Sequence, residues 1–428
     1  MGITNFCMLI NKLHEPNQEP PTVPEPFDSI LYDVQSLLHV ALGTALETDE
    51  PKLFQEMCRV VWCKMVQNLN EFLSHASVDH LTLVLSFDGE GVPMKWPTQR
   101  ERRTKKDGEQ RNVSLQGKSK YRSVLFGTNI IALKVQKYLV ECLKRYQFKK
   151  IEQLKVVVSG CNVPGEGEHK LFHIAEALHP DQCRHPLVLS EDQDVFVLSF
   201  MRLHRYDTLQ IYRYGKYYPV TRLVQEWLPY PMNHLEICSF LFGNDFIPAL
   251  VTISPNNYPT INQCLAFEDF SEDSDSLTEV EEDDEKKTLP ATHPVSIMAR
   301  FIQNMSSCLR YQSPSHLNAA LVESFWITFL WLQDYYTRSS FPQKYLENPV
   351  YDQFDRNQLL TALSTPRYSW ACYQRAETIY QQIIRNPSTS EQAEQAVFMH
   401  EDVVNLLKVY WTKPADKTCV VLSLTKRS

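Results

Sequence analysis

Four short β-type runs in the first half of the chain each lead into acidic residues. Helix-period segments separate these runs, which is the pattern of an open α/β fold with a mainly parallel sheet. The runs and their acids are Ser29–Tyr32 with Asp33, Leu81–Phe87 with Asp88, Leu154–Ser159 with Glu166 and Glu168, and Pro186–Ser190 with Asp192 and Asp194.

Acids at these positions point to a metal site. Active sites of open parallel sheets lie outside the carboxyl ends of the strands, so neighbouring strands would gather the carboxylates at one edge. Divalent cations relieve their mutual repulsion in a partly desolvated cleft, and all-oxygen ligands suit Mg²⁺ or Mn²⁺ rather than zinc. Two such ions roughly 3.5–4 Å apart would polarise a phosphodiester and activate water. Taken singly, each acid also fits an ordinary helix N-cap or turn residue.

The segment P-G-E-G-E-H-K (Pro164–Lys170) is the most specific single signal. Its two glycines permit a tight backbone path that presents Glu166 and Glu168 to one place. The residues that follow begin a predicted helix. A purely structural turn before that helix is the alternative interpretation.

A further acidic candidate is Asp245, in the segment G-N-D-F. It follows the apolar, helix-like stretch His234–Phe242. By itself Asp245 fits a turn residue after a helix, so its role depends on the other acids.

A basic segment follows Asp88 closely. Helical spacing would put several of its side chains on adjoining parts of one surface, where they can hold a phosphate through charge-assisted hydrogen bonds. A solvated helix face and a nuclear-localisation signal are the alternatives. The residues concerned include Lys95, Gln99, Arg102 and Arg103.

The bulk composition is compatible with a polyanionic partner. The net charge is −8, but Glu268–Lys287 holds 11 Asp or Glu against 2 Lys, which leaves 40 acidic and 41 basic residues elsewhere. The 11 cysteines include no C-x-x-C pair, so we expect reduced, mostly buried cysteines in a cytoplasmic protein, with a nuclear setting as the alternative. No apolar run is long enough to cross a bilayer, so we expect no membrane partner.

The length of 428 residues exceeds one ordinary core and predicts two domains. We expect an α/β core over residues 1–265, with a mainly parallel central sheet flanked by helices. The acidic, aperiodic residues 266–289 predict a flexible linker or insertion. The helical periodicity beyond Pro290 predicts a smaller, mostly helical C-terminal domain over residues 290–428.

Six motifs occur in a fixed order along the first part of the chain. They are M-G-I-T-N-F, F-D-S-I-L-Y-D-V-Q-S-L-L-H (Phe27–His39), F-D-G-E-G-V-P-M-K-W-P-T-Q-R-E-R-R (Phe87–Arg103), S-G-C-N-V-P-G-E-G-E-H-K, S-E-D-Q-D-V-F-V-L and L-F-G-N-D-F-I-P. This ordered set closely resembles the catalytic region of the 5′→3′ exoribonuclease (Xrn) family, over roughly Met1 to Leu250. The chain would be a compact and divergent member with a flap-endonuclease/PIN-like nuclease core.

The resemblance implies roles for individual residues. His39 matches the histidine that stacks on the leading base, although the sequence alone favours a core histidine on an apolar stretch of helix. The implied 5′-monophosphate pocket consists of Lys95, Gln99, Arg102 and Arg103. The implied metal-binding and catalytic cluster consists of Asp33, Asp88, Glu166, Glu168, Asp192, Asp194 and Asp245.

Two departures from the family pattern concern the substrate path. The first motif usually carries asparagine and glycine after its acid, where this chain has Gln35 and Ser36. The tryptophan-rich segment that completes the base-stacking pocket is not evident, and Trp370 is the candidate for it. All acidic positions of the motifs are present, which favours an active enzyme.

The sequence therefore predicts a metal-dependent 5′→3′ exoribonuclease, acting in RNA degradation such as mRNA decay. Its expected substrate is single-stranded RNA with a 5′-monophosphate, its products nucleoside 5′-monophosphates, and its cofactor two Mg²⁺ or Mn²⁺ ions. We expect a monomer. A structure-specific DNA flap or gap nuclease is one alternative, and a non-catalytic RNA-binding scaffold that keeps the fold is the other.

Overall fold

The chain forms two compact units in the computed structural model. The sheet unit comprises Pro20–Thr221, Arg338–Phe341 and Gln395–Ser428, and the helical unit comprises Met1–Glu19, Arg222–Thr337 and Pro342–Glu394. The structure describes residues 6–14, 23–44, 50–75, 80–89, 130–146, 153–161, 163, 165–178, 182–266, 279–282, 285–306, 308–309, 314, 316–337, 354–385 and 419–425.

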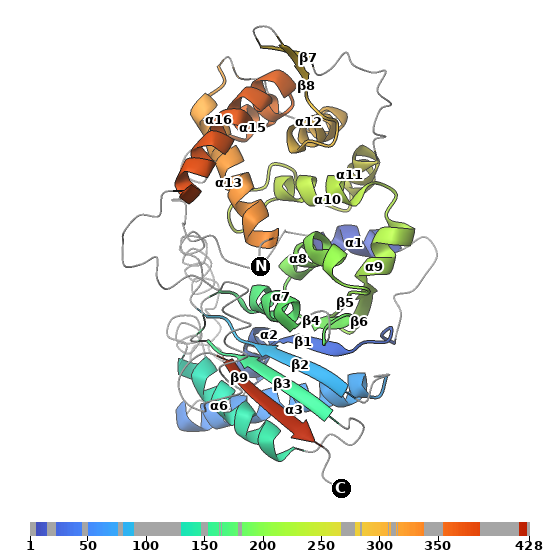
Figure 1. The fold of residues 1–428 in the computed structure, drawn as a ribbon, viewed down its shortest axis with the longest axis vertical. Coiled ribbons are helices and arrows are strands. Elements are labelled where there is room, and N and C mark those ends of the chain that lie inside the picture. Colours follow the sequence, from blue (N-terminus) through green and yellow to red (C-terminus); the bar gives the residue numbers. More distant parts are fainter. Residues whose placement is uncertain are drawn as a thin grey trace. The chain divides into compact units, whose positions relative to one another are not determined.

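A seven-stranded sheet forms the centre of the sheet unit, in the order β6-β5-β4-β1-β2-β3-β9 (Figure 1). The pairs β1–β2, β1–β4, β2–β3 and β4–β5 are parallel. This mainly parallel sheet confirms the predicted fold class and brings the carboxyl ends of β1 to β4 to one edge. The strands are β1 (Ser29–Asp33), β2 (His80–Ser86), β3 (Gln153–Ser159), β4 (Pro186–Leu189), β5 (Gln210–Arg213), β6 (Lys216–Pro219) and β9 (Cys419–Thr425).

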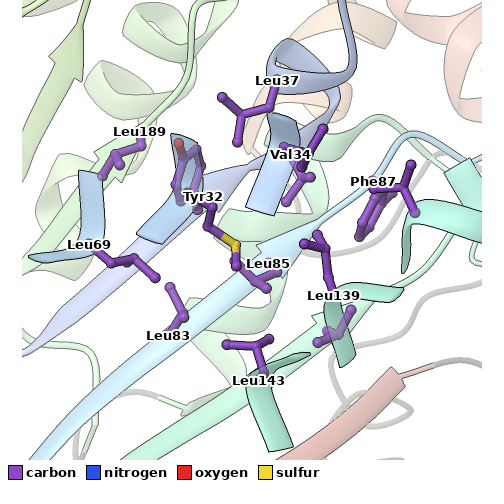
Figure 2. Close-up of a cluster of buried hydrophobic side chains, with 14 of the residues drawn as sticks. Tyr32, Val34, Leu37, Leu69, Leu83, Leu85, Phe87, Leu139, Leu143 and Leu189 are labelled. Carbon is purple, nitrogen blue, oxygen red and sulfur yellow. The ribbon is translucent and has the colours of Figure 1, made fainter. Parts of the chain in front are cut away.

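Helices cover both faces of this sheet. The core in Figure 2 lies between one face and the helices α2 (Val34–Thr44), α3 (Glu50–Leu73) and α6 (Ile130–Arg145). Alternate strand residues such as Leu83 and Leu85 are fully buried there, because side chains two apart share a face. On the other face α7 (Gly167–Leu178) packs against β1 and β2 and also contacts α8 (Asp194–Arg202).

The edge strand β9 was not predicted. The sequence prediction placed residues 290–428 in one mostly helical domain, whereas Cys419–Thr425 pairs antiparallel with β3 in the sheet unit (Figure 1). The pairing runs from Ser159 opposite Cys419 to Gln153 opposite Thr425. The run C-V-V-L-S-L-T has the valines and leucines typical of a strand, and by pairing with β3 it becomes the edge of the sheet in place of β3.

The helical unit buries an aromatic core. Its helix α13 (Ala319–Thr337) places Trp326, Trp331, Tyr335 and Tyr336 almost completely out of solvent, and it packs against α16 (Pro366–Arg385). Within the described residues this unit also contains α1 (Phe6–His14), α10 (Met232–Ser239), α11 (Tyr258–Leu265), α12 (Pro294–Asn304) and α15 (Arg356–Leu363). Short turns of helix occur at η2 (Leu203–Arg205), α9 (Val220–Arg222), η3 (Leu223–Trp227) and η4 (Phe240–Phe242).

The two units divide the chain differently from the sequential division at residues 265 and 290. Residues 222–265 belong with the C-terminal helices, because α10 and α11 pack against α12. Part of the expected flexible stretch forms a hairpin of β7 (Glu279–Glu282) and β8 (Glu285–Thr288). Its register runs from Glu279 opposite Thr288 to Glu282 opposite Glu285.

No disulfide joins the ten cysteines that the structure describes, and six of them are buried: Cys58, Cys161, Cys183, Cys238, Cys264 and Cys372. Within the described ranges, none of the helices combines the length and the apolar character needed to cross a bilayer.

Candidate active site

Asp33 closes β1 and lies almost completely buried, with 4% of its surface exposed. Its Oδ1 accepts a hydrogen bond from the Gln35 backbone N–H at 3.0 Å, and its Oδ2 accepts one from the Ser190 hydroxyl at 3.0 Å. The first bond caps α2, so the simple N-cap interpretation holds in part. The second bond joins the end of β1 to the residue that follows β4.

Asp88 meets the N-terminus of α7. Its Oδ1 accepts a hydrogen bond from the Gly167 backbone N–H at 2.8 Å, and the Gly89 N–H donates to the Gly165 carbonyl at 2.8 Å. A Cβ on Gly167 would lie 3.0 Å from Asp33 Oδ1 and 3.2 Å from Asp88 Oδ1. Glycine therefore lets both carboxylates approach the positive end of the helix dipole.

The second group gathers on the first turn of α7. Glu166, Glu168 and His169 offer ligand atoms that all lie within 4.8 Å of one another. Glu168 and His169 are buried, whereas Glu166 is half-buried. The two acids of P-G-E-G-E-H-K are thus presented to one place, as predicted.

Asp192 and Asp194 flank the start of α8. The Asp194 N–H donates to Asp192 Oδ1 at 3.1 Å, and the Asp192 N–H donates to Ser190 Oγ at 3.2 Å. Ser190 therefore connects Asp33 with this turn. Asp194 is buried, and Asp192 is half-buried.

The electrostatics of the edge reflect this crowding. Burial, and then the nearby carboxylate of Asp88, raise the pKa of Asp33 to about 8, while the hydrogen bond from Ser190 acts in the opposite direction. Asp192 adds to the repulsion. A divalent cation would offset this excess negative charge, so the residues present fit the implied metal.

Two buried contacts hold α7 in place. The Lys170 ammonium donates to the carbonyls of Gly160 at 2.9 Å and Val163 at 3.1 Å, which ties the loop after β3 to the helix. Near the other end of α7, Glu176 accepts hydrogen bonds from Arg202 and Arg205. This ion pair links α7 to α8 and η2, so the two acid-bearing helix starts are positioned together.

The other predicted site residues have different outcomes. Asp245 lies buried in the helical unit, in a turn where Asn244 Oδ1 accepts from the backbone N–H groups of Phe246 and Ile247. Its membership of the acidic cluster stays a prediction. His39 is on α2, but its side chain lies outside the described residues, as do the residues of the predicted phosphate pocket, Lys95, Gln99, Arg102 and Arg103.

Trp370, the candidate for the stacking tryptophan, packs within the helical unit. Its ring stacks on Tyr373 with centroids 5.7 Å apart, and its edge contact with His293 has a centroid distance of 4.9 Å. These contacts give the ring a packing role within that unit.

Sequence reasoning missed two polar residues of the site. The sequence predicts for His169 only the start of a helix, although it follows Glu166 by three positions, which is helical ligand spacing. The sequence predicts for Ser190 only the end of a strand, because no local signal marks a hydroxyl that reaches Asp33. The imidazole adds a nitrogen to the donor set, which broadens the suitable ions from Mg²⁺ towards Mn²⁺ and other transition metals.

Comparison with solved structures gives matches of low similarity. The catalytic core of Rad2 in complex with DNA substrate shares 13% identity over 90% of this chain and 100% of that chain, with a TM-score of 0.39. The flap endonuclease D15 of bacteriophage T5, with DNA and metal ions, shares 11% identity over 84% of this chain and 100% of that chain, with a TM-score of 0.33. No protein of curated function matches the chain.

The family comparison agrees with the motif order and with the acidic edge of the sheet. The family described as XRN 5′-3′ exonuclease N-terminus matches residues 1–213 of the 428. The match includes all six acids that the sheet unit carries to the edge, from Asp33 to Asp194. Through this region the chain belongs to the XRN 5′-3′ exonuclease family.

Proposed function

We propose that the protein is a divalent-metal-dependent 5′→3′ exoribonuclease that degrades 5′-monophosphorylated single-stranded RNA to nucleoside 5′-monophosphates. One observation carries the proposal: in a chain of this family, the acids at the ends of β1, β2 and β4 and at the start of α7 meet at one sheet edge. We expect a monomer that acts in the cytoplasm.

The chain's own residues would act as follows. Asp33, Asp88 and Asp192 would hold cations beside the scissile phosphodiester, and Glu166, Glu168 and His169 would complete the donor set. Bound Mg²⁺ or Mn²⁺ would supply Lewis-acid activation of water and of the leaving oxygen. Ser190 would fix the orientation of Asp33, because its hydroxyl donates to that carboxylate.

The specificity for the 5′ end is assigned to the basic segment. Lys95, Gln99, Arg102 and Arg103 would bind the terminal monophosphate and so set the distance to the first phosphodiester. Each cleavage would leave a new 5′-monophosphate, so the cycle repeats. His39 would stack on the leading base, and stacking reads no sequence by itself.

The test of this assignment compares two charge-reversed variants. Arg102→Glu/Arg103→Glu should weaken binding of 5′-monophosphorylated RNA much more than binding of 5′-hydroxyl RNA of the same sequence. The matched control is Lys144→Glu/Arg145→Glu on α6, whose side chains are exposed, and it should change both affinities slightly and equally. Equal losses on both RNAs in the first variant would contradict the assigned role.

Substrate choice separates the remaining candidates. Preferential cleavage of flap DNA over phosphorylated RNA would indicate a structure-specific DNA nuclease. Failure to bind Mg²⁺ or Mn²⁺ at the acidic edge, with RNA binding retained, would indicate a non-catalytic scaffold.

A further inference from the structure

A cavity of about 300 Å³ lies in the sheet unit beside the acidic edge. Its size is at the lower end of the range of about 300–1,000 Å³ that small-molecule sites occupy. Ser190 lines it and also donates to Asp33, so cavity and catalytic edge share a wall. The lining consists of Tyr32, Ser36, Leu37, Val40, Lys64, Asn68, Leu189, Ser190, Glu191, Tyr212, Tyr214 and Gly215.

The turn between β5 and β6 forms one side of the cavity under backbone strain. Arg213 pairs with Lys216, which leaves a two-residue turn in which Tyr214 has φ 46° and Gly215 has φ 79°. Such turns favour Asn, Asp or Gly at both positions, and strained residues cluster at functional sites. Tyr214 lines the cavity, and 69% of this residue is exposed to solvent.

The aromatic walls are held in place by their neighbours. The Arg213 guanidinium lies 4.5 Å from the centroid of the Tyr214 ring. The Tyr212 ring makes an edge contact with Phe72 at 4.8 Å between centroids, and Asn68 donates to the Tyr32 hydroxyl at 2.8 Å. These rings give the cavity the apolar, flat surfaces on which a planar base stacks.

Glu191 lines the cavity, and one of its carboxylate oxygens has no hydrogen-bond donor among the described residues. Its carbonyl accepts from Arg213 Nε at 3.0 Å, and its Oε1 accepts from the Tyr214 N–H at 3.4 Å. Its Oε2 is buried without a hydrogen-bond partner among the described residues. A buried carboxylate oxygen calls for an N–H or O–H donor. Because Glu191 lines the cavity, a rotation of its side chain towards the cavity would let a bound ligand supply that donor.

We propose that this cavity is a guanine subsite. Guanine alone among the four RNA bases presents two adjacent donors, N1–H and the 2-amino group, to a carboxylate. Tyr214 and Tyr212 would stack on the ring, and the exposed Lys64 at the lining would attract the nucleotide's phosphate. The case in which the bound guanine belongs to the substrate RNA rests on the proposed function. The base would then lie beside the catalytic carboxylates.

Binding of mononucleotides to the full chain tests the subsite without any catalysis. Calorimetric titrations with GMP, AMP, CMP and UMP are done in EDTA, so that phosphate does not bind through metal ions. GMP should bind about tenfold more tightly than the other three, as one good two-donor contact would give. Glu191→Gln should remove that preference and leave the affinity for UMP unchanged within about twofold.

A second variant keeps the test independent of folding. Tyr214→Asn suits the turn better than tyrosine, and it should weaken all four nucleotides by about tenfold through lost stacking. Tyr138→Ala, which removes an exposed tyrosine of α6 outside the cavity, is the control and should change none of them. Equal affinity for the four nucleotides, or unchanged GMP binding in Glu191→Gln, would overturn the subsite.

Two sources of guanine are distinguished by a degradation assay. On 5′-monophosphorylated RNAs with one guanine moved along a uridine strand, a Glu191-dependent change of rate at fixed distance from guanine would identify the substrate base as the ligand. Inhibition by free GMP without that positional effect would identify the mononucleotide product instead. Degradation without any GMP preference would sink the subsite alone, and GMP preference without degradation would sink the proposed function alone.

Discussion

The sheet unit and the helical unit bury different kinds of residue. The sheet unit buries Asp33, Glu168, His169 and Asp194 at one edge, where the desolvated charges destabilise the fold unless something compensates them. The helical unit fills its centre with Trp326, Trp331 and other aromatic residues, whose burial stabilises the fold. The sheet unit therefore concentrates buried charge at one edge, whereas the helical unit gains stability from a buried aromatic centre.

The contrast also explains the two glycines that matter most. The oxygens nearest to a Cβ on Gly167 would be those of Asp33 and Asp88, at 3.0 and 3.2 Å. Gly243 has φ +82° and would bring a Cβ to 2.6 Å from the backbone of Ala249. The absence of a side chain at Gly167 makes room for two carboxylates, and at Gly243 it makes room for a turn.

The largest expected effect on stability is in the helical unit. Trp326→Ala should lower the free energy of unfolding by about 3–5 kcal/mol, because it empties a fully buried site. Denaturant unfolding followed by tryptophan fluorescence and circular dichroism measures this. A loss under about 1 kcal/mol would show that the aromatic centre is not what stabilises the unit.

Alanine substitutions at Gly243 and Gly167 should affect different quantities, namely the free energy of unfolding and the affinity for metal. Gly243→Ala should cost about 2–4 kcal/mol through backbone strain and the clash with Ala249. Gly167→Ala should leave metal-free stability nearly unchanged, because only side-chain oxygens must shift, and should weaken Mg²⁺ or Mn²⁺ binding by about 10–100-fold. Thermal unfolding and metal titration measure the two quantities, and reversed effects would break the comparison.

The raised pKa of Asp33 predicts a pH dependence for the metal-free protein. The folded-state pKa of about 8 exceeds the unfolded value of about 3.8, so the folded state binds the extra proton between these values. Its stabilising effect is present at low pH and is lost as the pH rises through 8. The unfolding temperature in EDTA should therefore fall across this window.

Asp33→Asn serves as the control for this titration and should remove most of the slope. Added Mg²⁺ should restore stability to the unmutated protein at pH 8, because the cation replaces the proton. A metal-free protein whose stability rises steadily from pH 5 to pH 8 would contradict the account of the edge.

The smallest effect is expected at His293 in the helical unit. Burial lowers the pKa of His293 to about 4, and its ring caps α12 by accepting from the Val295 N–H at 3.2 Å. The stabilising effect of the neutral ring is present above pH 6.5 and is lost as the pH falls through 4, a loss on the order of 1 kcal/mol. His293→Asn keeps a capping side chain and should flatten this acid limb in thermal unfolding.

The sequence predicted the fold and the site best where an apolar run is followed directly by acidic residues. The alternation of apolar runs with acids predicted the parallel sheet, and strand ends predicted that Asp33 and Asp88 would meet. The strand β9 escaped prediction because it pairs with β3, 260 positions and more away along the chain, as the partners Ser159 and Cys419 show. Long-range pairing leaves no local periodicity to read.

The site residues that were missed have a common cause. Ser190 acts through a hydrogen bond to Asp33 across 157 positions, and His169 acquires its partners only when α7 begins at Gly167. Both depend on tertiary contacts, whereas strand-end acids follow from sheet topology alone. The placement of Asp245 in the helical unit likewise follows from helix packing rather than from its motif.

One time course tests the central claim that the acidic edge hydrolyses RNA from a 5′-monophosphate. Two 3′-labelled RNAs of one sequence, with a 5′-monophosphate or a 5′-hydroxyl, are incubated with Mg²⁺ and the unmutated protein or Asp192→Ala/Asp194→Ala. Only the monophosphorylated RNA should be degraded, and the double variant should lose at least about a thousandfold in rate. No degradation of either RNA in Mg²⁺ or Mn²⁺, or equal degradation by the double variant, would contradict the claim.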